Sequence, residues 1–234
     1  MIYVTSDLHG YPLDGFLQLL DKAGFGERDF LFVLGDVIDR GEHGVELLRW
    51  ISRQPNVQLI LGNHEAMMLA CEFMFETVTD ESLSRLDTKK LQLLSAWLQN
   101  GAQPTLSGLR TLSKEAPDIL EGIWDYVKDA PLYEEIEVGA RRFVLVHAGI
   151  ENFAASKSLD EYSPDELIWA RPTLQTRYYS DATVVLGHTP TEYFGEEYRG
   201  KILHADGWIC IDTGAACGGS PSLLRLDDMK EFCI

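Results

Sequence analysis

The chain has 234 residues, 45% of them hydrophobic, and carries a formal net charge of -17 with a pI near 4.6. This length and apolar content suffice for a sizeable buried core, and mixed α/β folds of this size commonly form one unit, so we expect a single domain over residues 1–234. The acidic balance disfavours nucleic acid and anionic membrane as partners, because the average field of the protein repels their phosphate charges.

The start of the chain and its apolar runs bear on its location. The first ten residues, MIYVTSDLHG, show no basic stretch ahead of an apolar one, so no signal peptide is predicted. No apolar run approaches the roughly 18 residues that a membrane-spanning helix requires. We therefore expect a cytoplasmic protein.

The opening of the chain predicts the order β-α-β-α-β. Apolar runs at residues 1–6, 29–35 and 57–62 predict strands, and the second run suits a strand covered on both faces. Apolar residues at helical spacing predict the two intervening helices: Leu13, Phe16, Leu17 and Leu20, ahead of Gly24 as a stop, and Val45, Leu48 and Ile51.

Residues 65–130 predict a helical cap or side layer, with helices at 65–75, 88–100 and 115–130. Residues 133–138 and 142–147 then predict a hairpin that turns at Gly139-Ala140. A short helix should follow in SPDELIWAR, residues 163–171, where Ser163 and Glu166 form a capping box. Further strands are predicted at 182–187, 201–205, 208–212 and 222–226.

Chemistry-bearing residues follow the predicted strands. Asp7, Asp36 and Asn63 stand 29 and 27 residues apart, close to the length of one βαβ unit, and loops at the carboxyl ends of such strands form a ligand crevice. In SDLHG an extended backbone would turn Asp7 and His9 the same way. The carboxylate of Asp36 could bridge two metals, and Asn63 offers a neutral oxygen ligand.

Two more imidazoles arrive at strand ends, His147 in VLVHAG and His188 in VVLGHTP. With them the chain carries seven ordered motifs, namely SDLHG, GDVIDRG, GNHE, the strand-terminal His147, LIWARP, LGHTP and IDTGA. This set resembles the calcineurin-like metallophosphoesterase superfamily, in particular the phosphoprotein phosphatase family of the bacterial and phage lambda protein phosphatase type. The resemblance spans nearly the whole chain.

The resemblance implies an α/β fold, a four-layer αββα sandwich of two mixed β-sheets flanked by helices, with a dinuclear metal site. It implies that one divalent ion is held by Asp7, His9 and Asp36, and the other by Asp36, Asn63, His147 and His188. It further implies that His64 is the general acid, that Asp39 orients it, and that Arg40 and Arg171 clamp the phosphate beside Asn63.

These roles agree with elementary chemistry. Two divalent ions about 3.5–4 Å apart can share a hydroxide and hold phosphoryl oxygens for in-line attack, so no protein nucleophile is needed. An imidazolium at His64 can protonate the leaving group while Asp39 keeps it charged and aimed. Guanidinium groups at Arg40 and Arg171 match phosphate with paired hydrogen bonds. Mixed histidine and carboxylate ligands suit Mn²⁺, our first expectation, and also Fe or Zn.

Structural roles compete with these functional ones. In isolation, Asp39 and Arg40 could pair with each other or cap the following helix, and Arg171 could offset a helix dipole. His147 and His188 could each be hydrogen-bonded core histidines. Beside the other motifs the functional interpretation is favoured, because specificity multiplies when the structural context agrees.

Four further residues are given no metal role. We expect Glu65 to lie in the first turn of its helix without a catalytic part. His43 should be solvated just beyond Arg40, and His204 matches no family motif. Asp212 in IDTGAACGG should brace its glycine loop.

The leading functional hypothesis is a metal-dependent phosphatase acting on phosphorylated serine or threonine in proteins. The alternative is a symmetrical bis(5'-nucleosyl)-tetraphosphatase or a small-molecule phosphatase, and the remote one is an inactive scaffold that binds a phosphorylated ligand. GNHE and GHTP favour the phosphatase, because the tetraphosphatase branch typically has GNHD and lacks Thr-Pro after its late Gly-His.

Overall fold

The computed structural model describes residues 1–76, 79–80 and 84–234. In the described part, the strands form two five-stranded sheets, ordered β10-β9-β1-β2-β3 and β4-β5-β6-β8-β7. The first contains β1 (Ile2–Thr5), β2 (Phe30–Val33), β3 (Val57–Leu59), β9 (Ser222–Arg225) and β10 (Lys230–Cys233). The second contains β4 (Tyr133–Val138), β5 (Arg141–Val146), β6 (Ala182–Leu186), β7 (Leu203–His204) and β8 (Trp208–Cys210).

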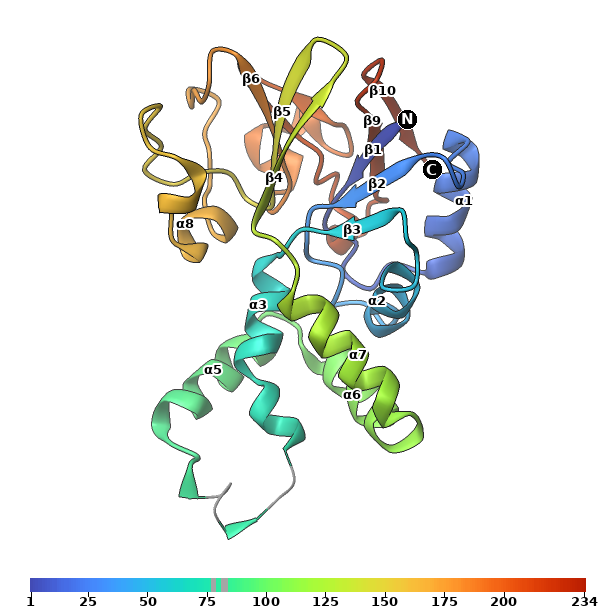
Figure 1. Cartoon of the computed structure of the whole chain (residues 1–234), viewed down its shortest axis with the longest axis vertical. Coiled ribbons are helices and arrows are strands. Elements are labelled where there is room, and N and C mark those ends of the chain that lie inside the picture. Colours follow the sequence, from blue (N-terminus) through green and yellow to red (C-terminus); the bar gives the residue numbers. More distant parts are fainter. Residues whose placement is uncertain (77–78, 81–83) are drawn as a thin grey trace.

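Both sheets are mixed. Strands β1, β2 and β3 run parallel to one another, and so do β5, β6 and β8, whereas β4, β7, β9 and β10 pair antiparallel with their neighbours. Each sheet therefore has a parallel centre with antiparallel strands at one or both edges. The amino and carboxyl ends of the chain lie near each other beside the first sheet (Figure 1).

The helices lie in three places. Helices α1 (Leu13–Ala23) and α2 (Gly44–Ile51) cover the first sheet, and the short α8 (Pro164–Ile168) lies beside the second (Figure 1). The remaining α-helices project from one end of the sandwich: α3 (Asn63–Ala70), α5 (Thr88–Gln99), α6 (Gln103–Glu115) and α7 (Pro117–Lys128). The 3-10 helices are η1 (Glu72–Phe75), η2 (Leu159–Glu161), η3 (Thr191–Phe194), η4 (Glu196–Tyr198) and η5 (Ala215–Cys217).

Strand alternation divides the buried side chains into layers. In β2, Leu31 and Val33 face helices α1 and α2, whereas Phe32 turns toward the second sheet. In β5, Val144 faces away from the first sheet while Phe143 joins Phe32 in the cluster between the two sheets. Because neighbouring side chains of a strand point to opposite faces, each central strand contributes to two cores. This gives the expected αββα sandwich.

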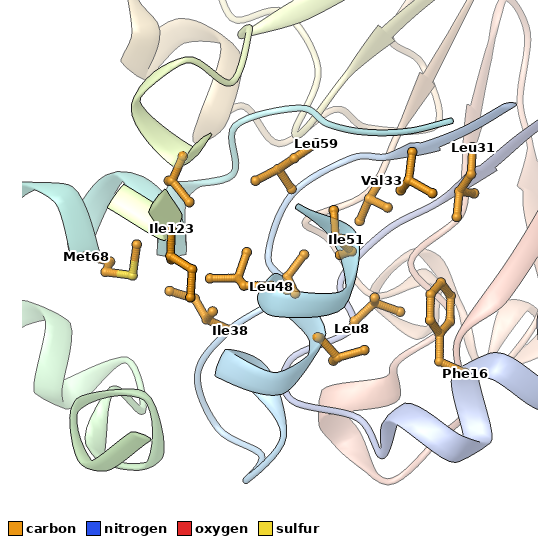
Figure 2. Packing of buried hydrophobic residues seen from close by; sticks show 14 of the residues in the cluster. Leu8, Phe16, Leu31, Val33, Ile38, Leu48, Ile51, Leu59, Met68 and Ile123 are labelled. Carbon is orange, nitrogen blue, oxygen red and sulfur yellow. The ribbon is translucent and has the colours of Figure 1, made fainter. Parts of the chain in front are cut away.

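The outer core of the first sheet is continuous with the projecting helices. Figure 2 shows Leu48 and Ile51 of α2 beside the strand residues Leu31 and Val33, with Met68 of α3 and Ile123 of α7 in the same cluster. Burying such a side chain contributes about 1.5–3 kcal/mol. Helices α3 and α7 are therefore anchored through the same core that supports the strands.

The predicted elements are confirmed within shifts of a few residues at their ends, although the helix expected at 65–75 is divided into α3 and η1. Among the described residues the structure adds α6, β10 and the short 3-10 helices η2 to η5. Helix α6 was not singled out because Pro104 and Gly108 interrupt its pattern. Pro104 occupies the first turn, where its missing N–H costs nothing, and a Cβ at Gly108 would lie 2.8 Å from Val45 Cγ2, so glycine allows α6 to approach α2. Strand β10 is an exposed edge whose polar sequence gives little signal.

Candidate metal centre and active site

Six loops that follow parallel strands carry the polar residues of the site. In the first sheet, β1, β2 and β3 lead to Asp7, Asp36 and Asn63. In the second, β5 and β6 lead to His147 and His188, and β8 leads to Asp212. All six are buried to at least 92%. Parallel strands bring their carboxyl ends to one edge, so the two sheets place these side chains against each other.

The carboxylate of Asp36 is the centre of the cluster. His9 Nε2 lies 3.5 Å from Asp36 Oδ2, and His147 Nε2 lies 3.5 Å from Asp36 Oδ1. Among the residues that the structure describes, two groups have ligand atoms close enough to hold a metal ion: His9, Asp36 and His64, and Asp36, His147 and His188. Each oxygen of Asp36 thus faces a different group of imidazoles, which is the arrangement that a bridging carboxylate requires.

The imidazole tautomers suit a cation. His9 Nδ1 donates to the carbonyl of Ile38 at 3.0 Å, and His147 Nδ1 donates to the carbonyl of Leu34 at 2.6 Å. Burial lowers the pKa of His9 to about 3 and also lowers the pKa of His147, so both rings are neutral and their Nε2 lone pairs point at the cluster. Backbone acceptors of this kind commonly orient metal-binding histidines.

Two further contacts indicate that a cation fits. His147 Nε2 lies 2.9 Å from Asn63 Oδ1, so these two potential ligand atoms lie side by side. His188 Nε2 is buried and has no hydrogen-bond partner among the described residues. Such an orphaned nitrogen is costly in a folded protein unless a ligand completes it. The residues present therefore fit divalent metal ions.

Asp7 joins the second sheet to this centre. Its Oδ2 accepts a hydrogen bond from the backbone N–H of His188 at 2.8 Å, and its Oδ1 lies 4.0 Å from His9 Nε2. Burial, together with the neighbouring charges of Asp212 and Asp36, raises the pKa of Asp7 well above its usual value. A nearby cation would remove this penalty, because it favours the charged carboxylate.

The backbone differs from the extended conformation expected for SDLHG. Asp7 and His9 have φ values of 52° and 42°, so they reach the site from a left-handed loop rather than by strand alternation. The loop is held because the His9 N–H donates to the Asp36 carbonyl at 2.8 Å. Four more site residues have positive φ: Asp36, Asp39, Arg40 and His188. Such conformations cost about 1–3 kcal/mol each and concentrate at functional sites.

Glu65 does more than the sequence indicated. It lies in the first turn of α3 as expected, but it is fully buried and its carboxylate accepts the N–H groups of Asp36 and Val37, both at 2.8 Å. Burial and the charge of Asp36 raise the pKa of Glu65 to about 7. Glu65 thus fixes the left-handed turn that presents Asp36. A Cβ at Gly62 would lie 2.6 Å from Glu65 Oε2, so glycine is required there.

His64 and Asp39 form a buried pair beside the cluster around Asp36. His64 Nδ1 lies 2.6 Å from Asp39 Oδ2, and His64 Nε2 lies 3.8 Å from Asp36 Oδ2. Burial alone would lower the pKa of His64, but the charges of Asp36 and Asp39 and the Asp39 hydrogen bond together raise it. The structure thus pairs Asp39 with His64, and Asp39 neither pairs with Arg40 nor caps α2.

The two arginines lie at the rim of the cluster. Arg40 Nη2 lies 3.4 Å from His64 Nε2, so its guanidinium and the imidazole face the same space. Arg171 lies three residues beyond the end of α8, and its Nη1 donates to Thr189 Oγ1, next to His188, at 3.1 Å. Both arginines are exposed.

The other two histidines lie apart from the cluster, each hydrogen-bonded to a glutamate. His43 Nδ1 lies 2.8 Å from Glu46 Oε2, and His204 Nε2 lies 2.7 Å from Glu231 Oε1. Asp212 braces its glycine loop as expected, because its Oδ1 accepts the N–H of Gly214 at 3.0 Å.

Sequence analysis missed two supports of the pair. Trp97 Nε1 donates to Asp39 Oδ2 at 2.7 Å, and Thr105 Oγ1 donates to Asp39 Oδ1 at 2.6 Å. These residues lie 58 and 66 positions beyond Asp39, so no local spacing could reveal them.

A two-sheet sandwich with carboxylates, imidazoles and an amide converging at its strand ends defines a class of metal-binding hydrolases that act on phosphoric esters. The model of the family called calcineurin-like phosphoesterase matches residues 1–212. The chain belongs to this family, and the resemblance found in the motifs is confirmed.

Three curated relatives match almost the full chain. The bis(5'-nucleosyl)-tetraphosphatase PrpE [asymmetrical] of Halalkalibacterium halodurans is 26% identical, covering 99% of this chain and 92% of the relative. Serine/threonine-protein phosphatase 2 of Salmonella typhimurium is 28% identical, covering 96% and 92%. The symmetrical bis(5'-nucleosyl)-tetraphosphatase of Chromobacterium violaceum is 27% identical, covering 100% and 94%.

A solved structure described as a candidate diadenosine tetraphosphatase superposes with a TM-score of 0.67 at 19% identity, covering 100% of this chain and 92% of that one. This likeness supports the fold alone. Within residues 1–76, 79–80 and 84–234, no helix has the length and apolar character needed to traverse a bilayer.

Proposed function

We propose that the protein is a dinuclear metal-dependent phosphohydrolase and that its preferred substrate is a dinucleoside polyphosphate. The observation that carries the proposal is the placement of Asp36, whose two oxygens lie 3.5 Å from His9 on one side and 3.5 Å from His147 on the other. When bound, two divalent ions would activate water and neutralise phosphoryl charge. Asp7, His9, Asp36, Asn63, His147 and His188 would hold these ions, and Mn²⁺ is the first to test.

The chain's own residues supply the rest of the reaction. The guanidinium groups of Arg40 and Arg171 would hold phosphoryl oxygens at the rim, with the Asn63 amide beside them. His64 would donate the proton of its Nε2 to the leaving oxygen while its Nδ1 stays hydrogen-bonded to Asp39. Because Asp39 is fully buried, water only weakly screens its electrostatic interaction with His64.

The substrate class rests on the relatives. Two of the three described above are named tetraphosphatases, and each match covers at least 92% of the relative. This support is stronger than the two motif differences that favoured a protein phosphatase. A phosphoprotein phosphatase is the second candidate, because GNHE and GHTP are present and the Salmonella relative is 28% identical.

A substrate panel tests the proposal. We expect Mn²⁺-loaded protein to hydrolyse diadenosine tetraphosphate with a higher kcat/KM than a phosphothreonine peptide, a nucleoside monophosphate or p-nitrophenyl phosphate. Two ADP molecules as products would indicate symmetrical cleavage, and ATP with AMP the asymmetrical reaction. A higher kcat/KM for the phosphothreonine peptide would favour the second candidate, a phosphoprotein phosphatase, over the leading one. If metal-loaded protein hydrolysed none of these substrates, or if chelation left turnover unchanged, the proposal of a metal-dependent hydrolase would be refuted.

A further inference from the structure

The segment joining α5 to α6 lies directly against the Asp39–Arg40 turn. Trp97 lies in the last turn of α5 and Thr105 in the first turn of α6. Between them, the Gly101 carbonyl accepts the N–H of Arg40 at 2.9 Å. Gly101 has a φ of 98°, and a Cβ there would lie 2.9 Å from Arg40 Cγ. The backbone approaches this closely only because the residue is glycine.

Thr105 closes a clamp on Asp39. Its hydroxyl donates to Asp39 Oδ1 at 2.6 Å and accepts the N–H of the same aspartate at 2.9 Å. One hydroxyl therefore ties the backbone and the side chain of Asp39 together, which fixes the carboxylate orientation. Asp39 has a φ of 70°, so this clamp also holds a strained backbone.

Trp97 donates a hydrogen bond to the other carboxylate oxygen of Asp39. Asp39 Oδ2 accepts from His64 Nδ1 at 2.6 Å and from Trp97 Nε1 at 2.7 Å. Asp39 and Trp97 are fully buried, and Thr105 is 1% exposed. A buried carboxylate is tolerated only when hydrogen-bond donors compensate its lost hydration, and the two cap residues supply two of the three side-chain donors.

The position of Trp97 explains how α5 docks. It is the one buried residue of that helix in the described structure. Packing alone would not require tryptophan here, because phenylalanine also supplies a large apolar ring. Only the indole N–H can reach the carboxylate of Asp39. Most of α5 is exposed, so a single side chain joins the helix to the catalytic centre.

We propose that Trp97 and Thr105 are positioning residues that aim the Asp39–His64 pair, so that this part of the helical cap sets the rate of leaving-group protonation. This inference rests on the proposed role of His64. It gives residues 97–105 a part in catalysis, whereas the sequence indicated only a helical cap or side layer. A misplacement of about 1 Å at such a pair can cost about 100-fold in rate.

Two variants and two matched controls test the proposal. Thr105→Val removes the hydroxyl at almost constant shape, and Thr105→Ser restores it. Trp97→Phe removes the indole N–H, and Trp124→Phe makes the same change at a buried tryptophan of α7 that packs on Phe75 with ring centroids 5.5 Å apart. All variants are compared in the full chain for metal content, for kcat and KM on the best substrate of the panel, and for unfolding.

A proton NMR signal provides a readout besides activity. In protein loaded with diamagnetic Zn²⁺, the His64 Nδ1 proton should resonate far downfield, and His64→Asn assigns it by removing it. We expect Thr105→Val and Trp97→Phe to shift or broaden this signal and to lower kcat about 10-fold with KM and metal content unchanged. Thr105→Ser and Trp124→Phe should leave both signal and kcat close to those of the unmodified protein.

The possible outcomes separate this inference from the proposed function. If Thr105→Val and Trp97→Phe keep the signal and kcat of their controls, the positioning role is wrong, whatever His64→Asn does. If both variants move the signal but His64→Asn retains full turnover, the cap residues do aim the pair while the general-acid role fails. Equal losses in Trp97→Phe and Trp124→Phe would reduce Trp97 to a packing residue and overturn its part.

Discussion

At the scale of single residues, Asp36 and His64 lie next to each other and differ in what surrounds them. Burial would raise the pKa of Asp36, but the imidazoles of His147, His64, His9 and His188 together lower it, so the carboxylate stays charged. His64 instead has a carboxylate behind it, which raises its pKa and keeps a proton available. The same fold thereby places the proposed metal ligand Asp36 and the proposed acid His64 within 3.8 Å of each other.

Substitutions at these two positions should therefore have different effects. His64→Asn removes the acid, so we expect bound metal to stay and kcat to fall about 10²–10⁴-fold. Asp36→Asn removes the shared carboxylate, so metal itself should be lost. Metal content by elemental analysis and kcat measured on the same samples check both. Metal loss in His64→Asn together with retention in Asp36→Asn would reverse the assigned roles.

Tyr178 gives a pH-dependent prediction. Its hydroxyl accepts the N–H of Ile150, in the loop that follows His147, and burial raises the pKa of Tyr178 to about 12 from the ordinary value of 10. Above pH 10 the unfolded chain releases this proton first, so the free energy of unfolding should fall as the pH rises from about 10 to about 12.

The free energy of unfolding should fall by about 2–3 kcal/mol because of Tyr178, and this fall should be absent below pH 10. Denaturant unfolding between pH 8 and 12 measures it. Tyr178→Phe should show a shallower decline, because phenylalanine has no proton to release. An identical pH dependence in the two proteins would show that Tyr178 does not contribute.

At the scale of elements, α3 and the turn after β2 form one unit through Glu65. The two oxygens of Glu65 accept N–H groups from two successive residues, Asp36 and Val37. An amide has only one acceptor oxygen, and its NH₂ would face a backbone donor. The unit therefore depends on a carboxylate at this position.

Glu65→Gln should accordingly destabilise the protein by about 1–3 kcal/mol and weaken metal binding, because it leaves a buried N–H unsatisfied and loosens Asp36. Denaturant unfolding without metal and metal titration followed by calorimetry measure the two effects. Glu76→Gln is a suitable control, since Glu76 is exposed. Unchanged metal affinity in Glu65→Gln would contradict the assigned support of Asp36.

At the scale of the whole molecule, the candidate metal centre joins the two sheets. Asp36 and Asn63 follow strands of the first sheet, whereas His147 and His188 follow strands of the second. Ligands shared in this way act only in the folded chain, so binding of metal should stabilise the whole sandwich. Bound cations should stabilise the fold further, because they would offset part of the self-repulsion of a chain with a net charge of -17.

Metal removal should therefore lower Tm. At metal concentrations about 100 times Kd the stabilisation is about 2.7 kcal/mol, equivalent to about 5–10 °C for a chain of this size. Calorimetry with Mn²⁺ and after dialysis against a chelator measures the shift. The Tm of the Asp36→Asn variant should differ little between the two conditions. A full shift of Tm in that variant would show that the stabilising metal binds elsewhere.

The sequence by itself determined most of the elements, the strand-end motifs and the family, because strand and helix periodicity are local and the motifs are contiguous. It also led to the six proposed metal ligands, although Asp7 and His9 meet through left-handed turns and not through an extended strand. Only the tertiary structure decided which groups support them. Glu65, Trp97 and Thr105 act across 27 to 66 positions of sequence, through side-chain contacts that exist only once the sheets and cap helices have packed.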